Sequence, residues 1–167
     1  GSINCADIGG DLSVDTASGD VHVKKARKLT LNSASGDVIA NEVAGPLQIR
    51  TVSGDLRLES AVLPLATLDV SSVSGEIQID GLCATGCRIG INTVSGDVRL
   101  RMYPQSSFML SMHTTSGELY RAHGKEPEKS TEDSDDSDRP PPTLKIGSGA
   151  GAIDLSTQSG DVHLIEG

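Results

Sequence analysis

The sequence predicts an all-β, single-domain β-solenoid, and three observations carry that prediction. A twelve-residue phrase recurs seven times in the 167 residues. Within each copy apolar and polar residues alternate, which is typical of a strand with one buried face. Aromatic residues make up only 2% of the chain, so its interior is expected to be thin and filled by Val, Leu and Ile.

The phrase reads apolar, x, apolar, x, Thr/Ser, x, Ser, Gly, Asp/Glu, apolar, x and usually apolar. Its copies are LSVDTASGDVHV from Leu12, LTLNSASGDVIA from Leu29, LQIRTVSGDLRL from Leu47, LDVSSVSGEIQI from Leu68, IGINTVSGDVRL from Ile89, LSMHTTSGELYR from Leu110 and IDLSTQSGDVHL from Ile153. One copy cannot bury its apolar face alone, so the copies must stack. We expect about eight coils of roughly 17 to 21 residues, right-handed because strand twist and crossover connections favour that hand.

The Ser-Gly-Asp/Glu step, here called the box, is predicted to be a corner between two strands. In the first copy Val14, Thr16 and Ser18 share one face, yet the next apolar residue, Val21, follows at an odd step. Glycine supplies the positive φ or bulge that such a phase shift needs. The box glycines are Gly19, Gly36, Gly54, Gly75, Gly96, Gly117 and Gly160.

The box carboxylates are expected to accept hydrogen bonds from backbone N–H groups that the corner leaves unpaired. They are Asp20, Asp37, Asp55, Glu76, Asp97, Glu118 and Asp161. A cation-binding edge is the alternative, but the nine-residue period of calcium-binding solenoids is missing. A second file holds the hydroxyls Thr16, Ser33, Thr51, Ser72, Thr93, Thr114 and Thr157. The alternation turns them inward or along the corner, which disfavours an ice-binding array.

The segment 122–142 is predicted to be an acidic, Pro-rich loop insertion in a domain that otherwise spans residues 1–167. It contains seven acidic and three basic residues, whereas the whole chain carries a net charge of −9. Ser130, Thr131, Ser134 and Ser137 make a phosphorylated regulatory tail the alternative to a tolerated surface insertion. After it, Thr143–Ala152 is expected to resume a partial coil. We interpret residues 1–2 as an expression scar, and the chain as a piece of something longer.

No catalytic, cofactor-binding or metal-binding group is predicted. The four histidines are scattered, with His22 and His163 expected at opposite ends of the rod. A carbohydrate-active β-helix enzyme would need unlike carboxylates and bases gathered on one face, and here the carboxylates are spread one per copy. Cys83 and Cys87 could form a disulfide across a corner or be small buried residues. Cys5 is left over, so the cysteines do not decide the compartment.

The outward positions between the last two apolar residues of each copy are the candidate binding face. His22, Arg57, Arg99, Tyr120 and His163 lie there with Ile39 and Gln78. This mildly basic face could meet an envelope glycan, a lipid, a peptide or another protein, although a merely solvated face explains it too. The run Lys24, Lys25, Arg27 and Lys28 lacks neighbouring aromatic residues, so no nucleic-acid partner is expected.

The recurrence of S-G-D/E-apolar-x-apolar after an apolar, x, apolar, x, Thr/Ser lead resembles a bacterial β-strand-repeat family named for adhesins, a domain of unknown function. The resemblance covers about Asp11 to Leu164. It implies a β-solenoid without established catalytic residues and a link to envelope stress. We therefore expect a non-enzymatic binding or scaffold module, at the cell envelope or outside the cytoplasm, with the cytoplasmic side left open. Self-assembly through exposed strand edges at the rod ends is the remaining alternative.

Overall fold

The structure is a computed structural model that describes residues 1–43, 45–62, 67–82, 86–103, 105–123, 126–129, 143–146 and 148–166. Every regular element in these residues is a strand, so none of them forms a helix able to cross a membrane. The strands are β1 Ile3–Thr16, β2 Val21–Ser33, β3 Val38–Asn41, β4 Leu47–Ser53, β5 Leu56–Val62, β6 Thr67–Ser74, β7 Ile77–Leu82, β8 Arg88–Ser95, β9 Val98–Met102, β10 Phe108–Ser116, β11 Leu119–His123, β12 Glu126–Lys129, β13 Thr143–Ile146, β14 Gly151–Ser159 and β15 Val162–Glu166.

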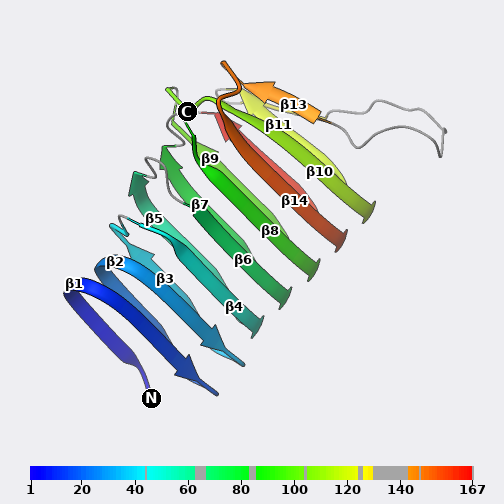
Figure 1. Ribbon diagram of the computed structural model, residues 1–167. Coiled ribbons are helices and arrows are strands. Elements are labelled where there is room, and N and C mark those ends of the chain that lie inside the picture. Colours follow the sequence, from blue (N-terminus) through cyan, green and yellow to red (C-terminus); the bar gives the residue numbers. More distant parts are fainter. Residues whose placement is uncertain are drawn as a thin grey trace.

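These strands form one curled sheet with two limbs, as Figure 1 shows. The lead limb holds the strands that run into a box, in the order β4-β6-β8-β14-β10, with the antiparallel strand β13 at its edge. The trailing limb holds the strands that leave a box, in the order β3-β5-β7-β9-β15-β11, with the antiparallel strand β12 at its edge. β1 and β2 are long enough to pass through both limbs. All pairings are parallel except β13 with β10 and β12 with β11, so the predicted all-β solenoid is confirmed.

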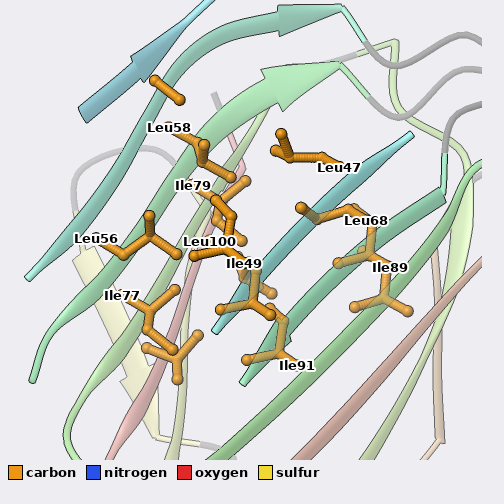
Figure 2. Packing of buried hydrophobic residues seen from close by; sticks show 14 of the residues in the cluster. Leu47, Ile49, Leu56, Leu58, Leu68, Ile77, Ile79, Ile89, Ile91 and Leu100 are labelled. Carbon is orange, nitrogen blue, oxygen red and sulfur yellow. The ribbon is translucent and has the colours of Figure 1, made fainter. Parts of the chain in front are cut away.

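The core lies between the two limbs, because alternate side chains of each strand point inward. In β4 Leu47, Ile49 and Thr51 are buried, whereas the intervening residues are exposed. Figure 2 shows Ile49, Ile89 and their neighbours from the lead limb facing Leu58, Ile79 and others from the trailing limb. Phe108 is the only aromatic residue in the buried cluster of the described residues. The aliphatic interior predicted from composition is therefore present.

The last copy does not stack in sequence order. β14 pairs with β8 on one side and with β10 on the other, and β15 likewise lies between β9 and β11. The seventh copy is thus inserted between the fifth and the sixth, as the position of β14 in Figure 1 shows. The expected placement of His22 and His163 at opposite ends of the rod assumed that the copies stack in sequence order, and they do not do so at this point. Identical boxes permit either order, so the repeat pattern holds no information about it.

Two antiparallel strands cover the edges of the sixth copy. Thr143–Ile146 pairs with β10, so the expectation that Thr143–Ala152 resumes a partial coil is wrong for these four residues. Glu126–Lys129 pairs with β11, so the segment 122–142 is not loop throughout. Both strands gain backbone hydrogen bonds at an edge that would otherwise be unpaired. Residues 130–142, with Ser130, Thr131, Ser134 and Ser137, lie outside the described residues.

At the opposite corner the first copies use residues other than glycine. Asp7, Lys25 and Glu42 have φ values of 53°, 56° and 54°, in the left-handed region. The ammonium of Lys25 lies 3.4 Å from the carboxylate of Asp7 in the preceding turn. One cation of the basic run therefore has an exposed acidic partner within the rod.

Candidate functional site

The box glycines occupy backbone conformations that other residues rarely adopt. All seven have φ between 112° and 147°. A Cβ built on Gly96 would lie 2.1 Å from the carbonyl oxygen of Gly75 in the neighbouring copy. At Gly160 the corresponding distance to the Gly96 oxygen is 2.2 Å. The corner therefore needs glycine for two reasons, its positive φ and the close approach of the next backbone.

The box carboxylates bind the backbone of the neighbouring copy. Asp55 Oδ1 accepts the N–H of Glu76 at 2.9 Å. The same bond joins Asp20 to Asp37 at 3.3 Å, Asp37 to Asp55 at 3.1 Å, Asp97 to Asp161 at 3.1 Å and Asp161 to Glu118 at 3.1 Å. These carboxylates link copy to copy, and the inserted seventh copy takes part on both of its sides.

The remaining box carboxylates have side-chain partners on the trailing limb. The Glu76 carboxylate forms an ion pair with the Arg99 guanidinium. The Tyr120 hydroxyl donates to the carboxylate of Glu118. Each partner lies two residues past a box, on the outer face. These two boxes therefore connect the corner to the candidate binding face.

The hydroxyl file faces inward and bonds to the corner backbone. Ser33, Thr51, Ser72, Thr93 and Thr157 are buried. Each donates to the carbonyl oxygen of the box serine two residues later, at 3.1 to 3.5 Å. Thr16 makes the same bond at 3.1 Å. Thr114, at the far end of the stack, is exposed.

The box serines supply a further bond between copies. Ser74 Oγ donates to the Val52 carbonyl oxygen at 3.4 Å, one copy earlier. In the inserted copy Ser159 Oγ donates to Val94, and Ser116 of the sixth copy donates to Gln158. The repeated serines, threonines and carboxylates are thus used in bonds that hold the rod together.

Replacement of Ser72 by alanine should lower the free energy of unfolding by about 1 kcal/mol, because it removes a buried hydroxyl and leaves the Ser74 carbonyl without that donor. Chemical denaturation followed by circular dichroism measures this difference. Ser71→Ala is the matched control, since its side chain lies on the outer face of the same strand. Equal effects of the two substitutions would contradict the inward assignment of the hydroxyl file.

The outward file of the trailing limb gathers the candidate binding residues into one row. Register pairing gives the order His22, Ile39, Arg57, Gln78, Arg99, His163 and Tyr120. Insertion of the seventh copy places His163 between Arg99 and Tyr120. The expectation that His22 and His163 occupy opposite ends is therefore wrong in detail, because Tyr120 lies beyond His163.

Contacts within this outward file connect neighbouring copies. The rings of Tyr120 and His163 stack with centroids 4.9 Å apart and planes 11° apart. Arg57 donates to Gln78 Oε1 at 3.3 Å and lies 3.9 Å from the Glu59 carboxylate. A hollow of about 240 Å³ beside Arg57 and Gln78 is lined also by Asp37, Ile39, Asp55, Leu56 and Glu76. Hydrogen-bond donors, hydrogen-bond acceptors and aromatic rings thus follow one another along the outward file.

A second surface feature is apolar and lies on the lead limb. Val52, Val73 and Val94 are 53%, 46% and 42% exposed. They precede the box serines of successive copies. Val52 and Val73 rim a shallow groove of about 600 Å³ with Ala17, Ala34 and the outward residues Asp15, Asn32, Arg50 and Ser71. Sequence reasoning treated this position as variable. The sequence pattern that could have revealed this surface is a valine at the outward position before the box serine in three consecutive copies.

Cys87 is buried and disulfide-bonded. Of the two alternatives that the sequence left open, a disulfide or a small buried residue, the disulfide therefore holds for Cys87. Cys83 lies outside the described residues, and Cys5 is a free thiol. Among the described His, Cys, Asp and Glu residues no group of three or more is arranged to hold a metal ion.

The stacked parallel strands and the bonds between boxes define the class of this protein as a β-solenoid built from repeats. The chain belongs to the Toastrack DUF4097 family, whose family model matches residues 7–165. No curated protein and no solved structure matches the chain. Membership identifies a domain of unknown function, so any activity has to be argued from the surface.

Proposed function

We propose that this domain is a non-enzymatic binding or scaffold module of the cell envelope that binds through the outward file of the trailing limb. The supporting observation is a division of roles between repeated and variable residues. Repeated carboxylates and hydroxyls are used in bonds inside the rod, as at Asp55 and Ser72. The outward file differs from copy to copy and carries the cations, the amide and the rings.

The chemistry of the file fits a hydroxyl-rich polymer, and we propose an envelope glycan. Its charges are balanced locally, since Arg99 faces Glu76 and Arg57 lies near Glu59. Paired guanidinium and carboxylate groups offer donors and acceptors side by side, which suits sugar hydroxyls. The side chains of the outward file recur at the strand spacing of about 4.8 Å along the rod, with Gln78 between Arg57 and Arg99, so an extended chain could contact several copies at once.

Soluble peptidoglycan strands are the probe for this proposal, with binding measured by isothermal titration calorimetry. Arg99→Ala should weaken binding about tenfold, because one charge-assisted hydrogen bond contributes about 1.5 kcal/mol. Arg50→Ala is the matched control, because it removes the same exposed side chain from the outer face of the lead limb. It should leave the affinity unchanged.

Equal weakening by Arg99→Ala and Arg50→Ala would place binding elsewhere or make it non-specific. Release of new reducing ends from the strands, abolished by substitution of one aspartate, would instead support a carbohydrate-active enzyme. Absence of binding to any glycan, lipid vesicle or peptide would overturn the binding role.

We also propose an extracytoplasmic location, supported by the disulfide at Cys87, because disulfides persist in oxidising compartments. For the coil itself we propose a right-handed turn repeated about eight times, which strand twist and crossover geometry favour. An adhesive role, which the name of the resembled family suggests, would be one form of this glycan binding.

A further inference from the structure

The most unusual feature of the rod is its C-terminal unit, β13 to β15, which is placed around the sixth copy rather than after it. β13 pairs with one edge of β10 and β14 pairs with the other. On the far side β14 and β15 pair with β8 and β9. Without this unit the fifth and sixth copies would face each other across an open slot, about two strand spacings or 9.6 Å wide.

The bonds that hold the unit in the slot are of two kinds. The first are the box bonds that any copy makes, such as Asp161 N–H to Asp97 and Glu118 N–H to Asp161. The second are specific to this unit. The His163 ring stacks on Tyr120, and Glu166 accepts two hydrogen bonds from Arg121 at 3.0 and 3.1 Å. The slot therefore recognises this particular copy by its side chains.

The ring stack of His163 on Tyr120 and the ion pair of Glu166 with Arg121 both join the C-terminal unit to the sixth copy. Residues 130–142 connect the unit to β12 in the sequence, and thirteen residues can span up to about 43 Å. A second copy of the chain offers the same strands, boxes and side chains. Exchange would replace each contact by an identical one, which is why swapping of whole elements has a low cost.

We propose that the C-terminal unit, Thr143–Glu166, is an exchangeable element, and that the slot between the fifth and sixth copies accepts the unit of a second copy of this chain. Each chain has one slot and one unit, so reciprocal exchange gives a closed, twofold dimer rather than a fibre. In this dimer the partner's unit completes the outward file, since its His163 equivalent stacks on Tyr120. The exchange thus joins two rods without changing either surface.

A cysteine pair across the slot tests the exchange directly. Asn92 and Ser156 are register neighbours on β8 and β14, and both are exposed. In a Cys5→Ser background, Asn92→Cys/Ser156→Cys should form a bridge. The chain is unfolded, refolded at low and at high protein concentration, and separated by size-exclusion chromatography with light scattering. Oxidised fractions are then run on a non-reducing gel.

We expect a species of doubled molar mass that grows with refolding concentration and in which the engineered bridge links two chains. Protein oxidised before unfolding should refold only as monomer, because its unit cannot leave. The control pair Arg50→Cys/Ser71→Cys joins β4 and β6 of one chain, so its bridge should stay within a chain in every fraction.

Two results would overturn the proposal. One is a strictly monomeric protein after refolding at high concentration. The other is a dimer whose Asn92→Cys/Ser156→Cys bridges all remain within one chain, since such a dimer would form through outer surfaces. Glycan binding is measured separately on monomer, so its failure would not bear on the exchange.

Discussion

Gly96→Val is expected to lower the free energy of unfolding by at least about 3 kcal/mol, because two separate effects act at this corner. A φ of 133° is strained for valine by about 1 to 3 kcal/mol. The new Cβ would also lie 2.1 Å from the Gly75 carbonyl oxygen, so the two copies would have to separate. The thermal midpoint should fall by roughly 6 to 12 °C.

Gly9→Val provides the comparison for this experiment. A Cβ added at Gly9 would have no atom within 4 Å, and the residue has no positive φ, although it too lies in a strand. Thermal unfolding of both variants is measured by circular dichroism. The difference between their midpoints gives the destabilisation that is due to the corner, apart from the effect of placing valine for glycine in a strand. An unchanged midpoint for Gly96→Val would contradict the corner assignment.

Ile91→Ala should destabilise the protein by about 3 kcal/mol, because it leaves a cavity in a close-packed aliphatic interior. Ile91 is completely buried, whereas Val94 on the same strand is 42% exposed. Both residues are apolar and β-branched, so residue type alone would predict a similar destabilisation for the two substitutions. Val94→Ala is therefore the matched control, with an expected effect within about 0.5 kcal/mol.

Denaturant titration measures both substitutions under the same conditions. Similar losses for Ile91→Ala and Val94→Ala would mean that the exposed valines Val52, Val73 and Val94 are covered in solution. That outcome would make the groove beside Val52 and Val73 a contact surface. A small loss for both would contradict the close packing between the two limbs.

The parts of the fold that follow from the sequence are those governed by local rules. Alternation of apolar residues sets which face of β4 is buried, and the odd step at each box requires a corner. Glycine at Gly96 and a carboxylate at Asp55 are then the residue types that such a corner can use. These inferences concern a residue and its immediate neighbours, so a single copy of the phrase is enough to make them.

For the candidate binding face, the sequence predicts which residues point outward but not the order in which they follow one another along the rod. The outward positions of Arg57, Arg99 and Tyr120 follow from period-2 alternation. Their order along the rod does not, because it depends on which copy stacks on which. The ring pair of Tyr120 and His163 joins residues of the sixth and seventh copies. It forms because the seventh copy lies between the fifth and the sixth.

The sequence by itself thus determined an all-β solenoid with glycine corners and an interior of aliphatic rather than aromatic side chains. Tertiary structure alone decided the position of the seventh copy between the fifth and the sixth, the antiparallel strands β12 and β13, and the resulting row of outward side chains. The physical reason lies in the repeat. Seven nearly identical boxes offer interchangeable hydrogen bonds, so local chemistry fixes each corner and leaves the order of the copies to the packing of the whole rod.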